Sequence, residues 1–537
     1  MTEHVLPQRV EIYDTTLRDG SQLEGISLTV EDKLRIAEQL DWLGVGYIEA
    51  GWPGANPKDD ELFRRAPKDL QLSTSTLVAF GSTRRVKGKV DSDDTLRHLV
   101  EANVGTVCIV GKSWDYHVLE ALGTTLDEGE AMVADSVEFL RNAGMQVLFD
   151  AEHFFDGYKH NPEFALRTLE AATAKGASHV VLCDTNGGAL PHEVERIVRE
   201  VVTYLGGDVH VAVHLHDDGG TGVANAIAGV LGGATQVQGT INGYGERTGN
   251  CNLTAIIPNL SLKMGIETIP ADRMQRLTPV AHHVAELVNM PLNPQAAYVG
   301  HSAFAHKAGL HMSAIAKRPD AYEHLSPDVV GNGTRFVVSE LAGKSTLVLK
   351  AKELGLELDG PQLAEVVESL KRLEHEGYHF EVADGSLELL MRRATGWEPD
   401  WFRVESFRVI TDDRTGIETL TDETGATVTT EATVKVFVAG RAVIATAEGN
   451  GPVNALDRAL RQALNGNFPA LERVHLTDYK VRVLDTQKGT GAVTRVLIDS
   501  TDGEQTWTTI GVNENIIEAS WQALLDSIHF GLLRAGA

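Results

Sequence analysis

The most informative feature of this chain is a repeated pattern in its N-terminal half. Short apolar segments, each ending in a polar or glycine-rich turn, alternate with segments whose apolar residues have helical spacing. The apolar segments are 9–20, 45–54, 71–82, 106–113, 146–154, 179–188, 209–218 and 235–247. Eight strand-then-helix units in about 250 residues are typical of a closed (β/α)8 barrel.

The intervening segments support this α/β interpretation. EDKLRIAEQLDWLG (31–44) and EFALRTLEAATAKG (163–176) have helical spacing, and the second ends on a glycine suited to a helix C-terminus. A doubly wound sheet is the weaker alternative. INGYGERTG (241–249) does not match GxGxxG, and the two GKS tripeptides (111–113 and 343–345) lack the first glycine of a phosphate-binding loop.

Two histidines in VHLHDD (213–218) raise the possibility of a metal site. On a strand, His214 and His216 point to the same face, about 6.6 Å apart along the chain. Both imidazoles can therefore turn toward one ion, although two ordinary half-buried histidines would give the same pattern.

A barrel fold favours the metal site over two ordinary histidines, because the active site of a barrel lies at the carboxyl ends of its strands. Asp19 and Asn250 would then add oxygen ligands to the two imidazoles, which favours a catalytic divalent ion over a structural zinc cage. The polar residues expected to converge there are Asp19, Glu49, Glu152, Thr185, His214, His216 and the loop GYGERTGN (243–250).

Composition narrows the possible partners. The formal net charge of −27 argues against broad binding to nucleic acid or to anionic membranes. The N-terminus lacks a signal pattern, and no apolar run is long enough to span a bilayer. Three cysteines without a CxxC pair fit a reducing compartment, so we expect a cytoplasmic protein.

Three motifs resemble a known family. DTTLRDGSQ (14–22), VHLHDD (213–218) and GYGERTGN (243–250) are similar to signatures of the metal-dependent acyl-CoA condensing enzymes, which include 2-isopropylmalate, homocitrate and citramalate synthases. The resemblance covers nearly the whole chain. EAGWPGANPKDDELF (49–63) and FFDGYKHNP (154–162) most resemble members that use pyruvate as acceptor; an isopropylmalate synthase more typically reads EAGFP.

The resemblance implies a set of site residues. Asp19, His214, His216 and Asn250 would bind a divalent ion (Mg²⁺, Mn²⁺ or Zn²⁺), with Arg18 beside the ketone oxygen of the acceptor. Together the cation and Arg18 would stabilise the alkoxide that develops on attack. Glu152 and Thr185 match family positions that contact the 2-oxo acid, although a structural cap is the alternative for Thr185.

The family segment that reaches over the active site, often that of a neighbouring subunit, resembles residues 301–322. Here His311 matches the proposed base and Tyr322 its partner. We rank His311 above the nearby His301 and His306 as the candidate for the base. Met312, Ser313 and Ala314 depart from the commoner HxxGxHxDG form. Glu246 is expected to assist thioester hydrolysis.

Acetyl-CoA, the co-substrate implied by the family, is a polyanion and needs a local cationic patch. STRRVKGKV (82–90) offers one, with Arg84 and Arg85 at the barrel rim. A solvated charged loop is the alternative.

The remaining chain is predicted to form separate modules. We expect the barrel over 1–275, a helical linker reaching over the active site over 276–395, with a helical stretch at 363–393, and an α+β regulatory domain over 396–537. In the last part, VNALDRALRQAL (453–464) and IEASWQALLDSI (517–528) share a spacing and indicate two similar strand-then-helix units. The resemblance implies a homodimer with an amino-acid effector, here isoleucine; dimerisation without a ligand is the alternative.

Three other functions stay open at this point. The chain could be an isopropylmalate synthase, a related lyase or aldolase, or a barrel kept only as a scaffold. A lyase would need no effector domain. A scaffold would need no cluster of Arg18, Asp19, His214, His216 and Asn250.

Overall fold

The computed structural model describes two compact units. One comprises Met1–Phe304 and Glu323–Thr334, and the other Ala305–Tyr322 and Arg335–Ala537. None of the described helices combines the length and apolar character that crossing a bilayer requires. The described residues are 6–206, 209–306, 318, 322–336, 344–380, 382–411, 430–464, 466–484 and 486–536.

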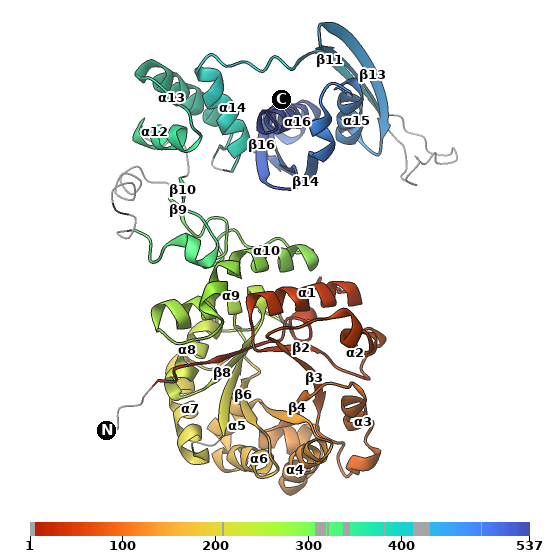
Figure 1. The fold of residues 1–537 in the computed structure, drawn as a ribbon, viewed down its shortest axis with the longest axis vertical. Coiled ribbons are helices and arrows are strands. Elements are labelled where there is room, and N and C mark those ends of the chain that lie inside the picture. Colours follow the sequence, from red (N-terminus) through yellow and green to blue (C-terminus); the bar gives the residue numbers. More distant parts are fainter. Residues whose placement is uncertain are drawn as a thin grey trace, which may run out of the picture. The chain divides into compact units, whose positions relative to one another are not determined.

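The first unit is built on a closed barrel of eight parallel strands, as the sequence predicts (Figure 1). Each strand pairs with the next one along the chain, and β1 also pairs with β8, which closes the barrel. The strands are β1 (Glu11–Asp14), β2 (Tyr47–Gly51), β3 (Thr76–Ser82), β4 (Thr106–Lys112), β5 (Gln146–Glu152), β6 (His179–Asp184), β7 (His210–Leu215) and β8 (Gln236–Gly239).

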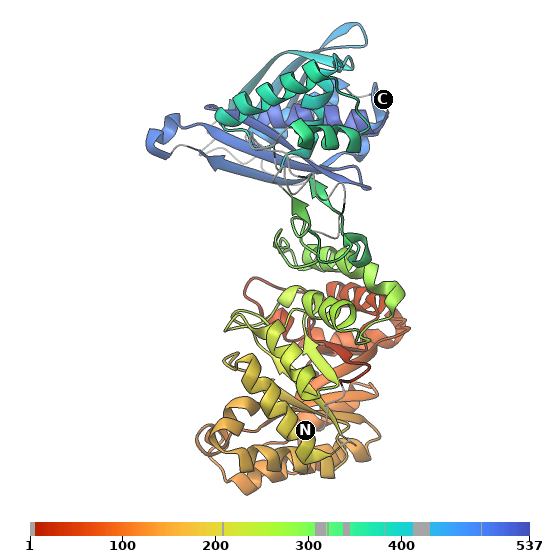
Figure 2. The same ribbon diagram turned by 90° about the vertical axis from the view of Figure 1, so that its left-hand side faces the viewer.

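Helices cover the outside of this barrel (Figures 1 and 2). The first begins at a capping box in which Thr29 and Asp32 bond each other's backbone N–H, and it ends at Gly44 in the left-handed conformation. The helices are α1 (Val30–Leu43), α2 (Pro57–Asp69), α3 (Asp94–Glu101), α4 (Leu126–Asn142), α5 (Phe154–His160), α6 (Pro162–Ala174), α7 (Pro191–Leu205), α8 (Gly222–Gly232), α9 (Leu253–Pro258) and α10 (Leu277–Leu287).

A polar cluster lies where the strands begin, at the end of the barrel opposite the expected site. Glu11 on β1 accepts hydrogen bonds from His179 on β6 (3.0 Å) and from Gln236 on β8 (3.1 Å). The ring of His210 on β7 stacks on His179 at 4.8 Å. Burial opposes the charged form of Glu11, but the His179 hydrogen bond and charge lower its pKa below the usual value.

This cluster predicts an acid-dependent contribution to stability. A carboxylate with a depressed folded pKa adds stability above its unfolded pKa, and the contribution is lost as pH falls through the folded value. We therefore expect Glu11→Gln to destabilise the barrel at pH 7 by about 1 kcal/mol. Thermal unfolding from pH 7 to pH 3 should show the difference shrinking below the usual glutamate pKa. A constant difference would contradict the prediction, and Glu38→Gln, at an exposed position on α1, is the control.

In the part of the second unit that the structure describes, a short parallel pair of strands, β9 (Ala305–His306) and β10 (Arg335–Phe336), is followed by the helices α12 (Lys344–Glu353), α13 (Gly360–His375) and α14 (Asp384–Ala394). The prediction of one helical stretch over 363–393 is wrong in its middle. The chain leaves α13 through Gly377, at a φ of 109°, and α14 starts only at Asp384. A glycine in this region of φ ends a helix readily, because it has no side chain to clash.

Two sheet-and-helix repeats follow, each with three antiparallel strands and one helix. The first repeat is β11 (Phe402–Thr411), β12 (Thr430–Val438), β13 (Arg441–Gly449) and α15 (Pro452–Leu464). The second is β14 (His475–Val483), β15 (Thr494–Thr501), β16 (Thr506–Asn513) and α16 (Ile516–Arg534). The apolar faces of both helices belong to one core. The predicted internal repeat therefore corresponds to two three-stranded sheets, each followed by a helix.

Candidate active site

A pocket of about 640 Å³ lies where the barrel strands end. Most residues selected from the sequence come together in its wall, whereas Glu49 and Asn250 are buried outside the lining and each bonds a lining residue. The selected lining residues are Arg18, Asp19, Arg84, Arg85, Glu152, Thr185, His214, His216 and Glu246.

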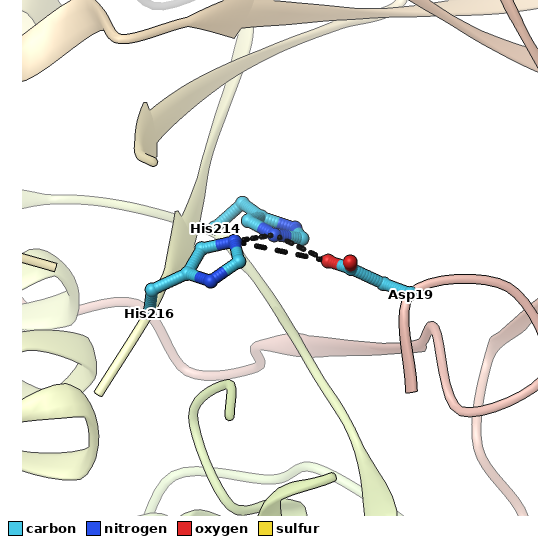
Figure 3. Close-up of side chains that lie close together, drawn as sticks. All are labelled: Asp19, His214 and His216. Carbon is cyan, nitrogen blue, oxygen red and sulfur yellow. Dashed lines mark hydrogen bonds and ion pairs between the residues drawn. The ribbon is translucent and has the colours of Figure 1, made fainter. Parts of the chain in front are cut away.

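Asp19, His214 and His216 form a compact cluster of possible metal ligands in this pocket (Figure 3). His214 and His216 lie at the end of β7 with their Nε2 atoms 3.4 Å apart. Oδ2 of Asp19, from the loop after β1, lies 3.1 Å from the first and 3.8 Å from the second of these nitrogens. All three side chains are buried. Three possible ligand atoms thus face one small volume.

Two amides complete the surroundings of this cluster. Oε1 of Gln238 on β8 lies 2.9 Å from Nδ1 of His214 and accepts its proton, so that Nε2 faces the cluster. Nδ2 of Asn250 donates to Asp19 at 2.7 Å, while its buried Oδ1 has no hydrogen-bond partner. An unpaired buried acceptor is costly, and a bound ion would satisfy it.

Charge around the cluster separates the pKa values of the two histidines. Burial disfavours a charged Asp19, but Arg18 and the His214 hydrogen bond hold the pKa of this carboxyl well below its usual range. Burial would lower the pKa of His214, but the hydrogen bond and charge of Asp19 raise it. The pKa of His216 falls to about 4, because of burial and the neighbouring His214. His216 is therefore neutral at pH 7 and has a lone pair for a metal.

Arg18 is held rigidly in the pocket wall. Its Nε donates to Glu49 Oε1 at 2.5 Å, its Nη1 lies 3.5 Å from Asp19 Oδ1, and its guanidinium stacks on the Phe80 ring at 3.8 Å. Glu49 also accepts from the hydroxyl of Tyr13 at 2.6 Å and is fully buried. The arrangement fixes a permanent cation beside the metal-ligand candidates.

One lining cation was not selected from the sequence. Lys112 at the end of β4 pairs in the strand register with Glu152 at the end of β5, and the two side chains form an ion pair. Lys112 belongs to the GKS tripeptide at 111–113. This tripeptide does not match a phosphate-binding loop, but that mismatch has no bearing on the role of a residue in a barrel. The signal that identifies it is its place at the carboxyl end of a barrel strand.

The loops after β6 and β8 supply three further polar groups. Oγ1 of Thr185 accepts from the backbone N–H of His153 at 3.0 Å, so its own proton is available to the pocket. Arg247 donates to Asp218 (2.7 Å) and to the Thr185 carbonyl (2.8 Å) and lies 3.3 Å from Nδ1 of His216. Beside it, Glu246 lines the pocket with a side chain that is 60% exposed.

The two arginines of the cationic segment differ. Arg84 is buried, with its guanidinium 2.7 Å from Glu128 and 2.8 Å from Asp135. Its charge is already compensated. Arg85 is exposed and lines the pocket, as expected of a residue that meets an anionic substrate.

His311 lies outside the described residues. Tyr322 is described and 47% exposed, His301 is exposed and His306 is half-buried. His301 belongs to the first unit and is absent from the pocket lining, whereas Tyr322 and His306 belong to the second unit.

Family models match three consecutive parts of the chain. The HMGL-like model matches residues 9–283, the model of the homocitrate synthase post-HMGL domain matches 298–378, and the LeuA allosteric (dimerisation) domain matches 381–532. The first match contains the whole barrel and covers just over half of the chain. The chain therefore belongs to the HMGL-like family.

Individual relatives are similar over nearly their full length. Proteins named (R)-citramalate synthase are 51% identical in Aquifex aeolicus (strain VF5; 98% of this chain and 99% of the relative) and 50% identical in Streptomyces coelicolor (99% and 98%). A probable 2-isopropylmalate synthase of Methanopyrus kandleri is 33% identical (98% of each chain). The resemblance to the citramalate synthase branch of the condensing enzymes is thus confirmed, and the isopropylmalate alternative is not favoured.

Proposed function

We propose that this chain is an acyltransferase that condenses acetyl-CoA with pyruvate and hydrolyses the thioester, giving citramalate and CoA. Identities of about 50% to proteins named (R)-citramalate synthase support the choice of acceptor. The observation that carries the chemistry is the buried cluster of Asp19, His214 and His216 beside the fixed cation of Arg18. We place the protein in the cytoplasm, where this reaction would serve isoleucine biosynthesis.

The cluster fits a divalent ion held by Asp19, His214, His216 and Asn250. The facing lone pairs of Asp19 and His214 repel each other unless a cation or proton lies between them. A half-turn of the Asn250 amide would direct its unpaired oxygen to the same point. Binding through Nε2 of His216 places a proton on Nδ1, so Arg247 has to turn from that atom toward Asp218. A bound ion would polarise the ketone of a 2-oxo acid.

The proposed reaction forms one carbon–carbon bond and one carbon–oxygen bond, and it breaks one carbon–hydrogen bond and one carbon–sulfur bond. A base removes a proton from the acetyl methyl group, the resulting carbanion attacks the ketone carbon, and the ketone oxygen gains the negative charge. Arg18 lies where it can donate to that oxygen without rearranging, because Glu49 and Phe80 already hold it. The proton taken by the base passes to this alkoxide oxygen. Water then attacks the thioester carbonyl, the CoA thiolate leaves, and it takes the proton that the water loses.

Two other groups are assigned to the acceptor. Thr185 is proposed to donate its free hydroxyl proton to the carboxylate of pyruvate. Glu152 is proposed to orient a ligand or a water molecule, since its ion pair with Lys112 keeps it in place at the pocket wall.

The base and the hydrolytic residues are proposed from the resemblance. His311 is assigned as base, Tyr322 as its partner, and Glu246 as the group that holds water for thioester hydrolysis. The exposure of Glu246 at the pocket rim fits contact with water.

Acetyl-CoA is proposed to bind over the segment that contains Arg85. Because Arg84 is already paired, charge reversal there would disturb α4 as well as the pocket. We expect Arg85→Glu to raise the KM for acetyl-CoA by about three- to tenfold at low salt, less at high salt, with the KM for pyruvate unchanged. Initial rates with each substrate varied would measure this. Arg97→Glu on α3, outside the pocket, is the control, and an equal effect of both substitutions would contradict the assignment.

The roles of the parts that follow the barrel are assigned from the resemblance to the family. We propose that 276–395 links the catalytic barrel (1–275) to a regulatory domain (396–537) that forms a homodimer and binds isoleucine. The match to the LeuA allosteric (dimerisation) domain supports dimerisation.

Thiol release from acetyl-CoA tests the proposed function. The purified protein would be assayed with Mg²⁺, Mn²⁺ or Zn²⁺ and with pyruvate, 2-oxobutanoate, 2-oxoisovalerate or 2-oxoglutarate. We expect the highest kcat/KM with pyruvate and citramalate as the product. A preference for 2-oxoisovalerate would indicate an isopropylmalate synthase, and no release with any acceptor would overturn the proposal.

A further inference from the structure

We propose that Trp52 limits the size of the acceptor: its indole forms the wall that meets the substituent of the 2-oxo acid, so that a methyl group fits and larger groups are excluded. This inference rests on the proposed function and extends it from reaction type to substrate selection.

The first support is a series of side-chain contacts that joins Trp52 to Arg18 through Phe80. The Trp52 ring meets the Phe80 ring edge-on, with centroids 5.3 Å apart and an interplanar angle of 82°. The Arg18 guanidinium also contacts Phe80, 3.8 Å from the ring centroid. All three side chains line the pocket. Since Arg18 is assigned to the acceptor's oxygen, the aromatic pair next to it offers an apolar surface to the acceptor's substituent.

The second support is that the segment carrying Trp52 cannot easily retreat. The backbone N–H of Trp52 donates to Oδ2 of Asp59 at 2.9 Å, and Nζ of Lys33 lies 2.5 Å from Oδ1 of the same carboxylate. The side chains of Lys33 and Asp59 are each only 7% exposed. A buried ion pair with good geometry resists separation, because breaking it leaves an uncompensated charge.

Close packing adds to this restraint. A Cβ at Gly51, the residue before Trp52, would lie 2.6 Å from Cγ of Asp59, so only glycine allows the carboxylate to approach the end of β2. Asn56, which caps α2, also donates to Asp59 at 2.9 Å. A wall that is fixed on its outer side discriminates by size, whereas a mobile wall would yield to a larger substrate.

Trp52→Ala and Trp52→Phe test the proposal, with Trp42→Phe as the matched control. Trp42 lies on α1, where Arg276 stacks on its ring at 4.7 Å, and it is absent from the pocket lining. Thiol release would give kcat/KM for pyruvate, 2-oxobutanoate and 2-oxoisovalerate. We expect Trp52→Ala to raise the ratio of kcat/KM for the larger acids to that for pyruvate by about 10- to 100-fold. Trp52→Phe should raise it by about threefold or more, and the control should leave it unchanged.

The outcomes separate this inference from the proposed function. Wild-type protein that does not use pyruvate would refute the proposed function. Wild-type protein that prefers pyruvate, with unchanged acceptor ratios in the Trp52 variants, would refute the role of Trp52 alone. If Trp52→Ala fails to fold by circular dichroism, Trp52→Phe decides, since a folded phenylalanine variant with the wild-type ratio also overturns the proposal.

Discussion

Replacing His214 with alanine is expected to remove both the bound metal and the activity of this protein. The substitution deletes one of three buried ligand atoms and leaves Asp19 without its 3.1 Å partner. We expect kcat/KM for thiol release to fall by at least about 10³-fold, because the charge that stabilises the developing alkoxide would be lost. Metal content of the dialysed protein, measured by inductively coupled plasma mass spectrometry, should fall from about one ion per chain to near zero.

His210→Ala is a matched control for this prediction. His210 lies on the same strand, β7, but at the opposite end of the barrel, where its ring stacks on His179. The control variant should keep its metal and most of its activity. An active His214→Ala variant, or a wild-type protein that binds no divalent ion, would return His214 and His216 to the role of ordinary buried histidines.

The barrel could be predicted because its pattern is local. Each strand of a buried parallel sheet is a short apolar run, and each outer helix has an apolar stripe, so eight alternations are readable without any tertiary information. The polar residues of the pocket were predictable for the same reason. Once a barrel is expected, a polar residue that ends a strand has a known place, and Asp19, Thr185 and His214 follow.

Contacts between residues on neighbouring strands were harder to predict. Glu152 was expected at the pocket, but its partner Lys112 comes from the adjacent strand, and only the register shows that the two are neighbours. Gln238 orients His214 across the boundary between β7 and β8. Such contacts depend on where one strand sits against another, and a side chain that holds a ligand carries no pattern of its own in the sequence.

The C-terminal part was predictable in its helices more than in its sheets. The helices α15 and α16 share an apolar spacing, which revealed the repeat. Strands such as β14 are exposed along most of their length and lack the alternation that would reveal them. The break between α13 and α14 was missed because apolar residues continue through it, and Gly377 is its main signal.

Replacing Arg18 with lysine is expected to reduce activity strongly while the metal remains bound. Lysine keeps the positive charge, but it cannot donate to Glu49 and stack flat on Phe80 at the same time. The fixed donor for the ketone oxygen would be lost, so we expect kcat to fall by about 10²- to 10³-fold with metal content unchanged. Arg276→Lys is the control, because that guanidinium also stacks on an aromatic ring and donates to a carbonyl, but outside the site.

Arg18→Met should add a loss of stability to the loss of activity. Glu49 is fully buried, and burial already raises its pKa against the opposing charge of Arg18. Without that charge, Glu49 must take up a proton or remain as an unpaired buried anion, which costs about 3–5 kcal/mol. The double variant Arg18→Met, Glu49→Gln removes the unpaired charge and should recover stability but no activity. Recovery of activity would mean that Glu49 inhibits the reaction rather than positioning Arg18. Equal stability of the wild-type protein, Arg18→Met and the double variant would mean that the pair does not hold the pocket wall.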